Sequence, residues 1–173
     1  MEEQELSEAV EKARRPEEKR VGLTMAIVAV LLAVATMAGH RMHTEEVVLQ
    51  TRAADQWAYY QAKNTRGQMY AADAKLAATL SDRAGSLASE LQQRSDSERS
   101  GAEDVHHKAE ALEEETQAAA KRAGYFDAAE IFFEIAIVLC SITLLTESLL
   151  YWKLSFAGAG IGIVIAIAGL LAH

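Results

Sequence analysis

The chain has 173 residues, half of them hydrophobic, with one proline and ten glycines, a composition that excludes disorder and favours long helices. A formal charge of −8 argues against nucleic acid as a partner, because phosphate binding requires a basic surface. The one cysteine, Cys140, lies in an apolar run, which excludes a disulfide framework. We therefore predict an all-α protein.

Residues 1–20 are predicted to form a charged cytoplasmic tail, followed by a first transmembrane helix at residues 21–39. These nineteen residues carry no charge and would span about 28 Å as a helix, close to the hydrocarbon thickness of a bilayer. The run is longer than the apolar core of a usual signal peptide. Five basic residues precede it and only Arg41 follows it closely, so the positive-inside rule places the N-terminus in the cytoplasm.

The segment between the first two transmembrane helices is rich in strong helix formers and has two predicted interruptions, at residues 64–67 and 95–101. The helices that these interruptions define, at residues 68–96 and 102–128, would each be about 40 Å long. They would pack as an antiparallel hairpin outside the membrane.

An aromatic helix is predicted at residues 44–64, before the hairpin. The two equal arms of the hairpin leave no length to offset it, so we expect this helix to lie along the membrane surface. Its rings suit the headgroup layer, and core or oligomer contacts are the alternative. The rings belong to Trp57, Tyr59 and Tyr60.

A coiled-coil seam follows the second interruption, because apolar or small residues recur at alternating steps of four and three. The series continues into a second transmembrane helix, predicted at residues 129–147. Its members are Val105, Ala109, Leu112, Thr116, Ala119, Ala123, Phe126, Phe133, Ile137 and Cys140. The first arm of the hairpin keeps the same spacing at Ala77, Leu80, Ala84, Leu87 and Leu91.

A third transmembrane helix is predicted at residues 153–172, behind an interface anchor of aromatic and basic residues. It carries a ridge of small residues at steps of four, which permits close helix packing in lipid, either within the chain or between chains. The ridge consists of Gly158, Gly162 and Ala166. Two pairs of small residues on the first transmembrane helix offer comparable surfaces: Ala29 with Ala33, and Ala35 with Gly39.

Two carboxylates, Glu130 and Glu134, lie four residues apart on one face of the second transmembrane helix, with Asp127 one turn earlier. Carboxylates at membrane depth are costly and are therefore candidates for proton relays or ion ligands. The alternative is that they reach water at the interface or bond to a neighbouring helix.

The histidines predict no metal site. His40 and His43 with Glu46 supply fewer ligands than a structural site needs, and the adjacent His106 and His107 should point about 100° apart on a helix and not share a site. No nucleophile, base and stabiliser converge either. We predict no catalytic residue, no cofactor and no enzyme activity.

The string Asp-Gln-Trp-Ala-Tyr-Tyr-Gln-Ala-Lys at residues 55–63, with the three-helix layout, resembles a bacterial membrane-protein family known as domain of unknown function 4337. The resemblance covers nearly the whole chain in layout and implies no activity or ligand. In the second cytoplasmic turn this chain has Thr146, Glu147 and Ser148 where the family pattern has basic residues.

The leading interpretation is a non-enzymatic assembly protein of the bacterial inner membrane, either a homo-oligomer or an accessory subunit of a membrane complex. The N-terminus would be cytoplasmic, with the hairpin and the C-terminus outside. Its partners would be the lipid bilayer and either itself or another membrane protein. The alternative is an oligomeric ion or proton conductor or a transport accessory that uses Glu130 and Glu134, and a third interpretation is a membrane sensor.

Overall fold

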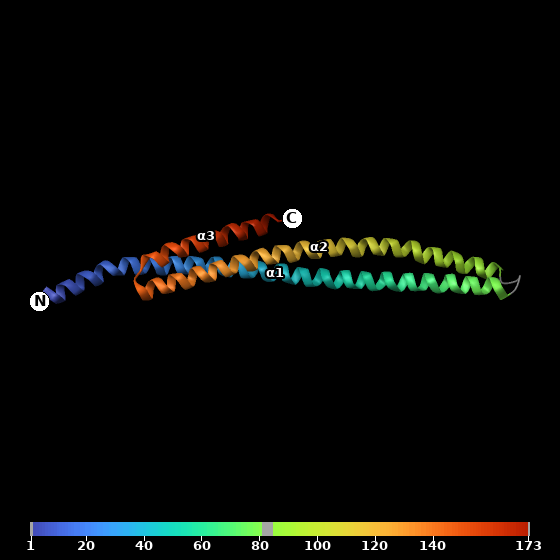
Figure 1. Cartoon of the computed structure of the whole chain (residues 1–173), viewed down its shortest axis with the longest axis horizontal. Coiled ribbons are helices and arrows are strands. Elements are labelled where there is room, and N and C mark those ends of the chain that lie inside the picture. The colour runs from blue at the N-terminus through green and yellow to red at the C-terminus, as the bar shows by residue number, and fades with distance from the viewer. Residues whose placement is uncertain (1, 81–84, 173) are drawn as a thin grey trace. The chain divides into compact units, whose positions relative to one another are not determined.

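A computed structural model of the chain describes the backbone of residues 2–80 and 85–172, and the side chains of residues 17–79 and 85–172. This described part contains three α-helices and no strand (Figure 1). They are α1 (Glu2–Leu80), α2 (Gly85–Thr146) and α3 (Leu149–Leu171). Each includes a window that is long and apolar enough to cross a membrane. The all-α prediction is therefore confirmed, together with three candidate membrane spans.

Helix α1 passes without a break through residues 40–43 and 64–67, where the sequence predicted helix ends. Gly67 is helical and buried, and it lies against the other long helix: the Ser95 hydroxyl donates to its carbonyl oxygen at 2.8 Å. A Cβ at this position would lie 3.2 Å from Cγ of Arg99. The glycine thus marks a helix contact and not a helix end, and the prediction of a separate helix at residues 44–64 is wrong.

Helix α2 is likewise continuous through residues 95–101, so the predicted division into helices at 68–96 and 102–128 is also wrong. The polar residues of this stretch serve contacts between the helices, since Ser95 is fully buried and Glu98 pairs with Lys63 at 3.2 Å. Instead, α1 ends at Leu80 and α2 begins at Gly85. This shift removes the length argument that placed residues 44–64 on the membrane surface.

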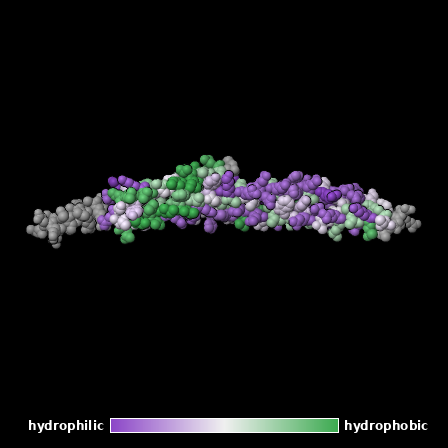
Figure 2. Space-filling view, viewed as in Figure 1, coloured by the Kyte–Doolittle hydropathy of each residue, from purple (hydrophilic) through white to green (hydrophobic). Residues whose placement is uncertain are grey.

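The helices group into two compact units. The first combines Met1–Thr44 of the N-terminal part with Ala118–His173, and the second is Glu45–Gln117. On the face seen in Figure 2, hydrophobic side chains gather on the first unit and hydrophilic ones predominate on the second. In the second unit, α1 residues contact α2 residues in opposite chain order: Trp57 meets His106, and Lys63 meets Glu98.

The buried face of α2 follows the predicted seam. Leu112, Thr116 and Ile137 are half-buried, and the other seam residues are buried: Val105, Ala109, Ala119, Ala123, Phe126, Phe133 and Cys140. Of the series predicted for the first arm, Ala77 on α1 is buried, whereas Leu87, in the first turn of α2, is 51% exposed. The side chains of Leu80 and Ala84 lie outside the described residues.

Helix α3 packs on α2 within the first unit, and the residues of α3 that are buried there are all small. Its buried face consists of Ser155, Ala159, Gly162 and Gly169. A Cβ on Gly162 would lie 2.9 Å from Cε1 of Phe133, and one on Gly158 would lie 3.6 Å from Cβ of Ala136. Ala166 packs against the same core. The predicted ridge therefore makes its close contacts inside the chain.

A two-residue connection separates α2 from α3. Glu147 has a φ of 57°, a left-handed conformation that glycine adopts without cost and other residues rarely adopt, and Ser148 is extended at the N-cap of α3. The second predicted span, at 129–147, thus ends at Thr146, and the third begins at Leu149, four residues before its predicted start.

Candidate functional site

Six polar side chains in and beside the apolar segments follow one face of the first unit. On α2 they follow one another at steps of three, four and seven residues, which keeps them on one side of a helix. Two α1 residues join them, through a hydrogen bond to Glu130 and a contact with Asp127. We call this set the polar stripe: Asp127, Glu130, Glu134 and Ser141 of α2 with Thr36 and His43 of α1.

Glu130 is half-buried against α1, where its carboxylate accepts a hydrogen bond of 3.0 Å from the Thr36 hydroxyl. This contact is the neighbouring-helix alternative that the sequence left open. At the end of the stripe, Nε2 of His43 lies 3.1 Å from Oδ2 of Asp127. His43 therefore pairs with a carboxylate of α2.

Glu134 differs from Glu130 because it is exposed and, among the described residues, has no hydrogen bond or ion pair. Its neighbours on the surface are apolar: Ile131, Ile135 and Val138 are each about half exposed. Since Thr36 lies beside Glu130, Glu134 lies one turn further along α2, at the level of residue 32 of α1. Residue 32 is roughly 10 Å along the helix from Gly39, the last residue of the predicted first span. An exposed carboxylate at that depth would face lipid if nothing covered it.

Next to the stripe, α1 carries small side chains on its outer face. Ala29 and Ala33 are both exposed, whereas Ala35 and Gly39 are buried against the rest of the unit. An open, solvent-facing space borders this face of α1. It is lined by Ala33, Thr36, Met37, His40, Arg41 and Thr44.

The aromatic residues of α1 form a second cluster, in the second unit. The rings of Trp57 and Tyr60 lie 5.0 and 5.1 Å from the His106 ring, each in an edge-to-face arrangement. Tyr59 points elsewhere: it is 48% exposed, with the Lys63 ammonium 5.7 Å from its ring centre. Trp57 and Tyr60 therefore contact α2, which is the kind of contact that the alternative to a membrane-surface position describes.

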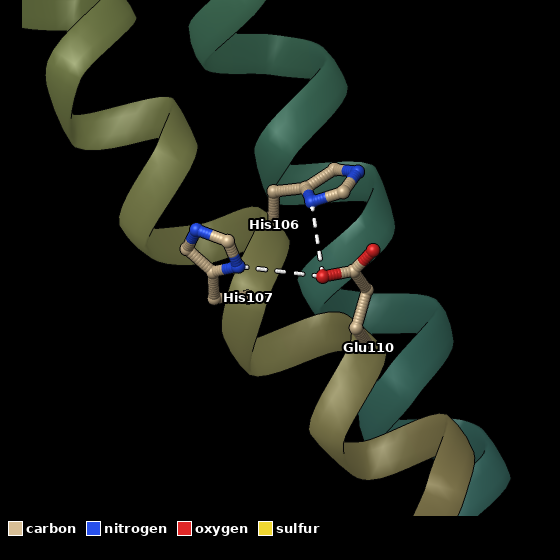
Figure 3. Close-up of side chains that lie close together, drawn as sticks. All are labelled: His106, His107 and Glu110. Atoms are coloured by element: carbon tan, nitrogen blue, oxygen red, sulfur yellow. Dashed lines mark hydrogen bonds and ion pairs between the residues drawn. The ribbon is translucent and has the colours of Figure 1, made fainter.

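His106 and His107 converge on one carboxylate, contrary to the expectation that they would not share a site (Figure 3). Their Nδ1 atoms lie 3.4 and 3.3 Å from the same Oε2 atom of Glu110. Glu110 is four residues after the first histidine and three after the second, so it faces both from one turn away. The spacing His-His-x-x-Glu predicts this contact, because residues three and four apart are neighbours on a helix surface. The two histidines considered alone do not predict it.

The Lys63, Arg66 and Glu98 side chains form an ion-pair group in the same unit. The Glu98 carboxylate lies 3.2 Å from the Lys63 ammonium and 3.4 Å from the Arg66 guanidinium. The hydrogen bond from Lys63 lowers the pKa of Glu98 below its ordinary value, with Arg66 adding to the effect. This group joins the two helices at the level of the predicted interruption.

Comparison with known proteins identifies the family. The model of a domain of unknown function, DUF4337, matches residues 17–172. The chain belongs to this family. No curated protein and no solved structure matches it.

The DUF4337 match covers the second unit and most of the first, includes residues 55–63, and attaches no activity to either cluster. In this DUF4337 chain the structure brings Glu130 to Thr36 and buries Gly162 against Phe133. It leaves Glu134 exposed on the surface of the first unit.

Proposed function

We propose that this chain is a non-enzymatic assembly protein of the bacterial inner membrane, and that copies of it associate through the polar stripe. The exposed Glu134 carboxylate carries the proposal. A charged group at membrane depth costs several kcal/mol when it faces lipid, so such groups nearly always face protein or water. A second copy that covers the stripe would place protein in contact with the carboxylate in place of lipid.

The small side chains beside the stripe support self-association. Ala29 and Ala33 are exposed at a spacing of four, and small residues at this spacing let two helices approach closely in lipid. The glycine ridge of α3 is used within the chain, whereas this small-residue face of α1 stays exposed to another copy. Accessory-subunit assembly would use the same face for a different membrane protein.

The proposed orientation places the N-terminus in the cytoplasm, with the arms and the C-terminus on the outer side. The basic residues before the first span support this orientation. The arms, residues 45–80 and 85–117, form an antiparallel hairpin outside the membrane in this proposal. Their charged composition and their ion pairs suit an aqueous setting.

Self-association is tested with a matched pair of variants in α1 and α3. Ala33→Leu adds bulk beside the stripe and should raise the dissociation constant of the oligomer at least tenfold, about 1.4 kcal/mol. Ala168→Leu adds the same bulk at an exposed position of α3 and should leave it unchanged. Energy transfer between labelled copies in liposomes measures both constants. A chain that stays monomeric at every protein-to-lipid ratio, or equal effects of the two variants, would refute the proposal.

A second candidate function is an oligomeric proton or ion conductor, favoured by the line of carboxylates along the stripe. If the stripes of several copies face one another, Asp127, Glu130 and Glu134 line a shared polar path. Glu134→Gln should then reduce proton flux into liposomes, while Glu115→Gln in the arm should not. Unchanged flux in Glu134→Gln would remove this candidate and leave the assembly role in place.

A further inference from the structure

The atoms of the His106, His107 and Glu110 cluster are arranged like the ligands of a metal ion. One nitrogen from each histidine and one carboxylate oxygen lie within 4.8 Å of one another. The two measured nitrogen-to-oxygen separations are 3.4 and 3.3 Å. Two ligands of a tetrahedral zinc ion, each at about 2.05 Å from the metal, are separated by about 3.3 Å.

The surroundings hold the cluster in place and favour a cation. Trp57 and Tyr60 pack edge-on against the His106 ring, which restrains the orientation of that ligand. Residues 101–117 contain six carboxylates and a single lysine, so the field around the cluster is negative and attracts a divalent cation.

We propose that His106, His107 and Glu110 bind one Zn²⁺ ion, with water in the remaining position. Two imidazoles and one carboxylate form a ligand set that zinc prefers, and a three-ligand site keeps an open coordination position. His107 is exposed at 78% of its side chain and Glu110 at 50%, so the ion exchanges with solution. A site this open to solution is not needed for the fold.

Zinc binding is measured on the purified full-length chain in detergent, after removal of any affinity tag, by competition with a chromophoric chelator. One ion per chain should bind with a dissociation constant on the order of 10 µM or below, weaker than four-ligand structural sites. His107→Ala and Glu110→Gln should each weaken binding at least tenfold. Both residues are exposed, so circular dichroism should show unchanged helix content in the two variants.

Glu115→Gln is the matched control, because it makes the same change at an exposed position on another side of α2. It should leave the zinc affinity within twofold of the original. Cobalt in place of zinc gives a second measurement, since a tetrahedral site produces intense visible absorption that His107→Ala should abolish. Equal zinc affinities in the original chain, Glu110→Gln and His107→Ala would overturn the proposal. This result would leave the self-association of the first unit untouched.

Discussion

Gly162→Ala tests whether the contact of α3 with α2 depends on the absence of a single methyl group. The added Cβ would lie 2.9, 3.0 and 3.2 Å from three atoms of the Phe133 ring, against an ordinary separation of about 3.5–4.0 Å between carbons. Phe133 is 2% exposed and enclosed by the core of the first unit, so the ring cannot turn aside freely. Overpacking of this kind costs about 1–3 kcal/mol.

Gly160→Ala provides the reference, because nothing lies within 4 Å of a Cβ at that position of the same helix. Both variants gain the same preference of alanine over glycine in a helix, up to about 1 kcal/mol, so the difference between them isolates the steric cost. The Gly162→Ala chain should be less stable than the Gly160→Ala chain by about 1–3 kcal/mol. Reversible unfolding in mixed detergent and dodecyl sulfate micelles, followed by circular dichroism, measures both free energies.

Phe133→Leu in the Gly162→Ala background is the check on mechanism. The smaller side chain removes ring atoms that the new methyl group would meet, so the two changes together should cost less than the sum of each alone, by at least about 0.5 kcal/mol. Equal stabilities of the Gly160→Ala and Gly162→Ala chains, or strict additivity in the double variant, would refute the packing described for α3.

Three further predictions concern the arms and the connection between α2 and α3. The Lys63 ammonium lowers the pKa of Glu98 below its ordinary 4.5, so this ion pair stabilises the folded chain above pH 4.5 and the stabilisation is lost as the pH falls through the lowered pKa. Thermal unfolding should therefore show a larger loss of stability in acid for the original chain than for Glu98→Gln. Parallel pH profiles of the two chains would contradict this prediction. Glu147→Gly should be more stable than Glu147→Ala by about 1 kcal/mol, since both lose the carboxylate and only glycine adopts the φ of 57° without cost; equal unfolding free energies would contradict this. Ser95→Ala should lower the free energy of unfolding by about 1 kcal/mol in chemical denaturation, because the fully buried hydroxyl donates a hydrogen bond to the Gly67 carbonyl oxygen. An unchanged denaturation midpoint would show that this hydrogen bond does not contribute to stability.

The seam and the interruptions show how far local sequence signals reach. Val105, Ala109 and Ala123 were predicted to share a face because their spacing matches the turn of a helix, and all three are buried. Gly67 and the stretch around Ser95 were predicted to end helices, because glycine and short polar residues do so when nothing else acts on them. Here each contacts the opposite helix, and tertiary contacts outweigh these weak local preferences.

The candidate sites divide in the same manner. Glu130 was recognisable from its place in an apolar run, but its Thr36 partner lies 94 residues away in the sequence. The angle between adjacent helical residues predicts that the side chains of His106 and His107 diverge, but the Glu110 carboxylate lies one turn later and contacts both. A surface position for Trp57 requires helices that end near residues 64 and 96, whereas α1 continues to Leu80 and Trp57 contacts His106.

The sequence by itself determined the helical composition, the three apolar windows, the face of α2 that is buried and the small-residue ridge of α3. These features follow from side-chain periodicity and hydropathy, which act between residues a few positions apart. Only the tertiary structure decided which helix each face meets, that the ridge packs on Phe133, and that Glu134 stays exposed. Those outcomes depend on the register between distant segments, and that register is set by the summed packing of both helices.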